Sequence, residues 1–138
     1  RLQFRQISPM ILLSEVAIMK VLFIEYPKCS TCQKAKKHLL SLGVEVEARH
    51  IVEDTPSVEE LTAWWKRSGL PLKKFFNTSG NLYKELHMKE RLPLMSEEEQ
   101  LKLLSEHGML IKRPLLVTEQ VVLVGFKEEN YTNLCSQS

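Results

Sequence analysis

The sequence predicts an α/β fold with a mixed four-stranded sheet (β-α-β … β-β-α) and an all-helical insertion between the two β units. A strand, turn and helix over residues 21–42 precede an alternating strand at 44–51. Such a strand–helix–strand unit is right-handed and places its two strands parallel. Two β-favouring runs, at 114–118 and 121–124, are typical of an antiparallel hairpin. Residues 57–109 lie between these units and carry helical patterns.

The first strand and helix have clear boundaries. Residues 21–24 form an apolar run without alternation, typical of a strand buried on both faces. Pro27 ends this strand, a helical pattern opens near Cys29 or Ser30, and Gly43 acts as the helix stop. We therefore expect a tight turn between a buried strand and a helix.

The insertion begins with a helix capped by Thr55 or Ser57, and a second long helix opens at the capping box that starts with Ser96. Shorter helices are predicted at 71–76 and 82–86, and a last helix follows the hairpin from about Glu128. Two adjacent tryptophans lie on the first helix of the insertion. We expect them in the core rather than on a binding platform, because large aromatic side chains usually bury their area.

Composition limits the class of protein. The 138 residues are 43% hydrophobic and 26% charged, which is typical of a soluble globular chain. A net charge of +2 is too small to indicate nucleic-acid binding, and no apolar run approaches the ~20 residues that span a bilayer. Three cysteines do not make a disulfide scaffold. We expect a cytoplasmic protein without direct nucleic-acid or membrane contacts.

The first residues are interpreted separately. Arg1 is not an initiator residue, and Met19-Lys20 directly precedes the first strand. We expect residues 1–18 to be an upstream or added segment and 19–138 to be one domain. A signal peptide is the competing interpretation, because residues 10–13 are apolar, but that run is short for one.

The stretch Cys29-Ser30-Thr31-Cys32 places two cysteines at the start of the first helix. Unpaired N–H groups and the helix dipole stabilise a thiolate there, so the thiol pKa falls. Lys28 adds positive charge nearby. Cys29, at the tip, is predicted to attack, and Cys32, one turn further in, to resolve a mixed disulfide. The pattern therefore predicts a dithiol redox site.

Two other interpretations of the pair stay open. It could be half of a zinc site, or two incidental thiols. Zinc would need two further ligands at suitable spacing, and only Cys135 and four scattered histidines remain. We expect no metal and no tightly bound cofactor.

Three further pieces of sequence carry a family resemblance. They are residues 26–35 around the CxxC motif, residues 110–116 with Arg113-Pro114, and Val124-Gly125-Phe126. Together they resemble the glutaredoxin-coupled arsenate reductase and Spx family, ArsC-like proteins with a thioredoxin-like fold, over residues 21 to about 134.

The resemblance implies roles for single residues. Cys29 matches the family's nucleophile, Arg113 the arginine that helps to bind an oxyanion, and Pro114 the cis-proline that faces the redox site. We expect Lys28 to join Arg113 and Pro114 on the substrate side. The reductases are similar in using two further arginines, but residues 73–77 and 126–127 carry lysines in this chain.

Two functions follow as hypotheses. The first is a thiol reductase with a glutathione, glutaredoxin or thioredoxin reductant and a small oxyanion or disulfide as substrate. The second, similar to Spx, is a redox-switched regulator that binds RNA polymerase through a surface controlled by the Cys29–Cys32 pair.

Overall fold

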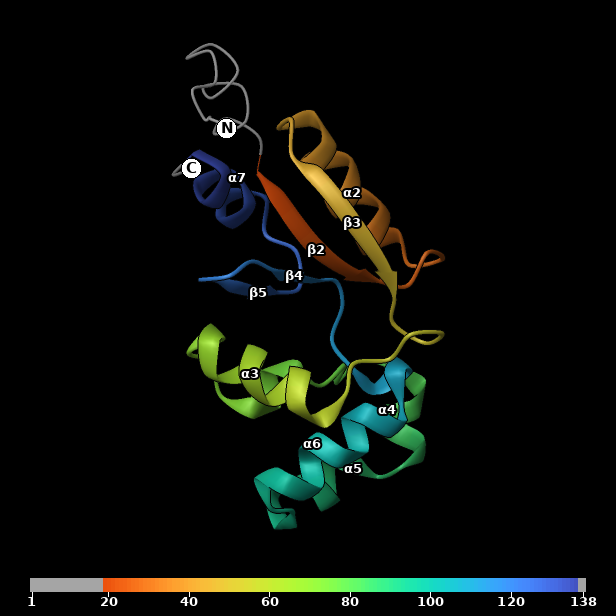
Figure 1. Ribbon diagram of the computed structural model, residues 1–138. Helices are drawn as coiled ribbons and strands as arrows, with labels where there is room; N and C mark the ends of the chain where they lie inside the picture. Colours follow the sequence, from red (N-terminus) through yellow and green to blue (C-terminus); the bar gives the residue numbers. More distant parts are fainter. Residues whose placement is uncertain (1–18, 137–138) are drawn as a thin grey trace, which may run out of the picture.

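The computed structural model describes residues 19–136. The expectation for residues 1–18 lies outside the described residues. Among residues 19–136, no helix combines the length and the apolar character needed to cross a membrane. Figure 1 shows the sheet with α2 and α7 beside it, and the helical insertion as a separate layer next to β5.

The sheet has the predicted four strands in the spatial order β3–β2–β4–β5. Its strands are β2 (Lys20–Glu25), β3 (Glu45–His50), β4 (Leu115–Val117) and β5 (Val122–Val124). β3 runs parallel to β2, with Ala48 opposite Phe23. β4 runs antiparallel to β2, with Leu116 opposite Phe23 on its other side, and β5 pairs antiparallel with β4. The mixed sheet is therefore confirmed.

The predicted helices occur in the predicted order, together with further short elements in the insertion; α denotes α-helices and η single 3₁₀ turns. They are α2 (Ser30–Ser41), α3 (Val58–Ser68), η1 (Leu72–Phe75), α4 (Asn81–Glu85), α5 (Met88–Arg91), η2 (Leu92–Leu94), α6 (Glu97–Glu106), η3 (Gly108–Leu110) and α7 (Glu128–Ser136). Both long helices of the insertion begin at a capping box, formed by Ser57 with Glu60 and by Ser96 with Glu99.

The central strands β2 and β4 are buried on both faces of the sheet, as the apolar run in β2 predicts for that strand. Val21 and Phe23 pack with Leu116 against α2 and α7, and they form one cluster of buried residues. Ile24, Leu115 and others on the opposite face belong to a larger cluster with the insertion. Successive side chains of a strand point to opposite faces, so each central strand contributes to both clusters.

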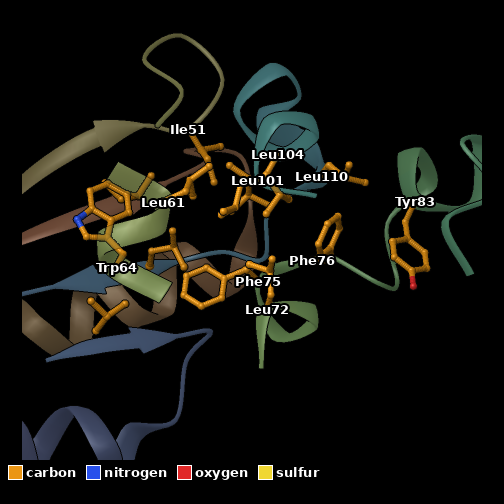
Figure 2. Packing of buried hydrophobic residues seen from close by; sticks show 14 of the residues in the cluster. Ile51, Leu61, Trp64, Leu72, Phe75, Phe76, Tyr83, Leu101, Leu104 and Leu110 are labelled. Atoms are coloured by element: carbon orange, nitrogen blue, oxygen red, sulfur yellow. The ribbon is translucent and has the colours of Figure 1, made fainter. Parts of the chain in front are cut away.

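The larger cluster is the core of the insertion. Its side chains from α3, η1 and α6 point into the space between these elements (Figure 2). Trp64 is 5% exposed within this cluster, whereas Trp65 is only partly buried and donates its indole N–H to the carbonyl of Leu70 at 2.9 Å. The core assignment is thus confirmed fully for Trp64 and partly for Trp65.

β3 forms one edge of the sheet and is the least buried strand. Glu45, Glu47 and Ala48 are exposed, and Lys20 of β2 lies 3.7 Å and 3.5 Å from the carboxylates of the two glutamates. The alternation in the sequence therefore marks an edge strand that is mostly solvated.

Gly108 marks a close approach between the insertion and the sheet. A Cβ atom at this buried position would run into the carbonyl oxygen of Ile51, directly after β3. The Gly108→Ala variant is expected to lose about 1–3 kcal/mol of unfolding free energy, because the clash is with backbone rather than a flexible side chain. Urea unfolding measures this loss, and Lys102→Ala on the exposed side of α6 is the control. A Gly108→Ala protein as stable as wild type would contradict the close approach.

Candidate functional site

The two cysteines lie at the junction between the end of β2 and the start of α2. The N–H of Cys29 donates to the carbonyl of Tyr26 at 2.9 Å, which closes the turn through Pro27. Cys29 is the N-cap residue of α2, with extended backbone angles. Lys36 joins the helix to the strand, because its ammonium group lies 3.2 Å from the buried carboxylate of Glu25. The predicted strand, turn and helix are confirmed.

Cys29 is partly buried, and its pKa lies below the ordinary value. Burial alone would raise the pKa of Cys29. Hydrogen bonds to the sulfur from the backbone N–H and thiol of Cys32 and from the N–H of Thr31, together with the charge of Arg113, lower that pKa. The first turn of α2 carries no acidic residue to oppose this effect. A thiolate at Cys29 is thus stabilised by donors at a helix start.

Cys32 is fully buried, and its pKa moves in the opposite direction. Burial, together with the hydrogen bond to Cys29 and the negative charge on Cys29, raises the pKa of Cys32 to about 12. At neutral pH the pair therefore consists of a thiolate-prone outer sulfur and a neutral inner thiol. The two thiols of the pair therefore differ in their tendency to ionise.

Arg113 brings positive charge to both cysteines. Its charge lowers the pKa of Cys29 and opposes the rise at Cys32. The guanidinium carbon lies 5.3 Å from the centroid of the Tyr26 ring, and Nη1 donates to the carbonyl of Met109 at 3.3 Å. The buried Nε has no hydrogen-bond partner in the described part of the chain. Arg113 therefore keeps one N–H uncommitted beside the cysteine pair.

The Arg113–Pro114 peptide bond is cis, as the resemblance implies. Pro114 is buried, and its carbonyl accepts a hydrogen bond from the N–H of Gly125 at 2.8 Å. Gly125 has φ +77°, a left-handed conformation that glycine adopts without strain. Gly125 of the Val-Gly-Phe motif thus holds the backbone of Pro114 through this hydrogen bond.

Tyr131 completes this support and was not identified from the sequence. Its hydroxyl donates to the carbonyl of Gly125 at 3.3 Å, and its ring meets Phe126 edge to face at 4.9 Å. Burial and the nearby charge of Cys32 raise the pKa of Tyr131.

Tyr26 was also missed as a site residue, although it directly precedes the Pro-Lys-Cys sequence, a signal that could have been used.

The lysines differ from the expectation. Lys28 is exposed, and it is not among the groups that lower the pKa of Cys29. Of the lysines near the expected arginine positions, Lys74 and Lys127 line one cavity of about 340 Å³, together with Lys112. Lys73 lines a different cavity, within the insertion.

No further zinc ligands lie near the cysteine pair in the described part of the chain. Within residues 19–136, no three or more His, Cys, Asp or Glu side chains gather in a way that could hold a metal ion. Cys135 packs with the smaller core cluster in the last turn of α7, and burial raises its pKa.

The chain is similar to several known proteins. A solved structure from Bacteroides fragilis, described as ArsC family related, is 60% identical with a TM-score of 0.81, covering 84% of this chain and 98% of that one. YusI, an uncharacterized protein of Bacillus subtilis (strain 168), is 57% identical over 113 residues, covering 82% and 96% of the two chains. The regulatory protein MgsR of the same organism is 30% identical over 104 residues, covering 75% and 81%. The ArsC family model matches residues 24–134. The chain belongs to the ArsC family.

Proposed function

We propose that this protein is a thiol–disulfide oxidoreductase in which Cys29 attacks and Cys32 resolves. The observation that carries the proposal is the opposite shift of the two thiol pKa values within one CxxC pair. A nucleophilic sulfur must be a thiolate, whereas a resolving thiol acts only after the first step. A reducing cytoplasm would keep the pair ready to react.

The reaction balances as a two-electron exchange. The Cys29 thiolate attacks one sulfur of a substrate disulfide, the S–S bond breaks, and one half leaves as a thiolate that takes up a proton. The mixed disulfide removes the negative charge from Cys29, and with it one cause of the high pKa of Cys32. Cys32 then loses its proton and attacks Cys29, which releases the second half. Two electrons from a thiol reductant, such as glutathione, glutaredoxin or thioredoxin, restore the dithiol.

Arg113 and Pro114 are proposed to hold the substrate in this exchange. The uncommitted Nε–H of Arg113 suits an anionic or developing thiolate group, since hydrogen bonds to charged acceptors are stronger than neutral ones. The buried cis-proline is proposed to face the sulfur pair and Lys28 to act at the exposed rim.

A regulator is the second candidate, favoured by the match to MgsR, which is named a regulatory protein. In this interpretation the Cys29–Cys32 disulfide would set the affinity for RNA polymerase. The two functions differ in stoichiometry. An enzyme consumes many equivalents of reductant per protein molecule, whereas a switch reacts once.

The first prediction concerns the thiolate. The alkylation rate of Cys29 with iodoacetamide, followed by peptide mass spectrometry, should show a pH inflection below the ordinary thiol value of about 8.5. Arg113→Gln should move the inflection to higher pH, because a positive charge that favours the thiolate is lost. Lys28→Gln is the matched control and should leave it nearly unchanged. An inflection at the ordinary value in wild type would remove the basis for Cys29 as nucleophile.

The second prediction separates the two sulfurs. Cys29→Ser should reduce disulfide exchange to background, whereas Cys32→Ser should accumulate a mixed disulfide with the substrate, because no second thiol resolves it. The oxidised wild-type protein should contain a Cys29–Cys32 bond by mass spectrometry. Cys135→Ser is the control and should keep full activity. A dominant bond to Cys135 would contradict these roles.

The third prediction is a low arsenate reductase activity. A tetrahedral oxyanion is best held by several planar guanidinium forks, and of the expected arginines only Arg113 is present. Steady-state arsenate reduction with glutathione and glutaredoxin should therefore be far slower than exchange with a small disulfide. Robust arsenate turnover that depends on both Cys29 and Arg113 would overturn this expectation.

A further inference from the structure

A cavity of about 340 Å³ opens between the end of α3, η1, β5 and the start of α7. Three ammonium side chains line it, from Lys74, Lys112 and Lys127, and no carboxylate is among its lining residues. This space is called the lysine cavity below. Each lysine comes from a different segment, so the fold rather than the local sequence brings the three charges together.

The charges in the lysine cavity are not neutralised. Elsewhere Lys20 and Lys36 pair with glutamates, but Lys74, Lys112 and Lys127 form no ion pair within residues 19–136. Glu128 and Glu129 follow on α7, yet neither lines the cavity. A hollow bordered by charges of one sign concentrates the opposite charge from solution. The occupant favoured by this wall is therefore an anion.

The lysine cavity is lined by residues that contact the segment carrying Pro114. Gly125 and Tyr131 line the cavity, and the N–H of Gly125 donates to the carbonyl of Pro114 at 2.8 Å. Lys112 directly precedes the Arg113–Pro114 bond. Its Cε lies 3.4 Å from the place that a Cβ on Gly125 would occupy. The lysine cavity therefore adjoins the segment that carries Arg113 and Pro114.

We propose that the lysine cavity selects disulfide substrates that carry negative charge, such as carboxylates, on the arms beside the sulfurs. This inference rests on the proposed dithiol function and names the substrate class for it. Lysine ammonium groups are point charges on flexible stems, so they accept carboxylates in many orientations. Three of them suit a substrate whose charged arm varies in position. Arg113, beside the sulfurs, can then donate its Nε–H to the thiolate that forms in the exchange.

The test uses three small symmetric disulfides that differ in charge: dithiodiglycolate, which is anionic, bis(2-hydroxyethyl) disulfide, which is neutral, and cystamine, which is cationic. Each enzymatic kcat/KM is divided by the rate of the same disulfide with free dithiothreitol, which removes differences in intrinsic reactivity. Wild type should favour the anionic over the cationic substrate. This preference should weaken as salt rises from low to physiological ionic strength, because exposed charges are screened.

The decisive variant is Lys74→Gln/Lys112→Gln/Lys127→Gln in the full chain. Its anionic-to-cationic ratio should fall about tenfold, the lower end of what electrostatic focusing contributes to association. Its rate with the neutral disulfide should stay unchanged, which shows that the fold and the dithiol are intact. The control Lys66→Gln/Lys84→Gln/Lys102→Gln loses the same charge from exposed positions of the insertion and should keep the wild-type ratio.

The outcomes separate the two proposals. Turnover of all three disulfides with a ratio that the lysine cavity variant does not change would overturn the charge selection and leave the dithiol function standing. An equal fall in the control would assign the effect to net charge and would also overturn it. Absence of turnover with every disulfide would overturn the oxidoreductase function and this inference with it.

Discussion

The pairing of β2 with β4 is the constraint on which the site depends. Ile24 lies opposite Leu115 in an antiparallel register. This register sets the end of β2, and so the turn to Cys29, beside the start of β4, where Pro114 stands. The two halves of the site are far apart in the sequence, and this ladder brings them together. The insertion between them therefore has to return the chain to the correct edge of β2.

The chemical asymmetry of the cysteine pair follows from how α2 begins. The N-cap position keeps Cys29 at the protein surface among unpaired backbone donors, and one turn later Cys32 lies fully inside. A separation of three residues thus gives the two thiols opposite environments. Arg113 acts on both, so its charge favours ionisation of the pair while burial decides which sulfur carries the negative charge. The helix start, rather than any single neighbour, thus accounts for the opposite pKa shifts of the two thiols.

Much of the fold could be predicted because its signals are local. The apolar run in β2, the capping boxes at Ser57 and Ser96, and the two runs of the hairpin each specify an element from neighbouring residues. The short helix α5 could not be predicted in this way. It starts after His87, whose φ of 55° is rare outside glycine, and no local stop or cap marks it.

The residues of the candidate site also divide into those with a local sequence signal and those without one. The cysteines, Arg113 and Pro114 were found from motifs, whereas Tyr131 and the gathering of Lys74 with Lys112 depend on contacts between distant segments. Lys28 illustrates the opposite case, since its proximity in sequence suggested a lowering of the Cys29 pKa that hydrogen bonds from Cys32 and Thr31 and the charge of Arg113 supply instead. Sequence distance is therefore a poor guide to electrostatic influence in this site.

The exposed edge strand β3 has a consequence for the behaviour of the protein in concentrated solution. An edge strand offers unpaired N–H and C=O groups to which a strand of another molecule could add. Here the edge carries Glu45 and Glu47, and Arg49 holds a bidentate contact with Glu60 at 2.7 Å and 2.8 Å. Charged side chains along an edge oppose the addition of a strand from another molecule. The charged edge of β3 thus also opposes edge-to-edge association of the sheet.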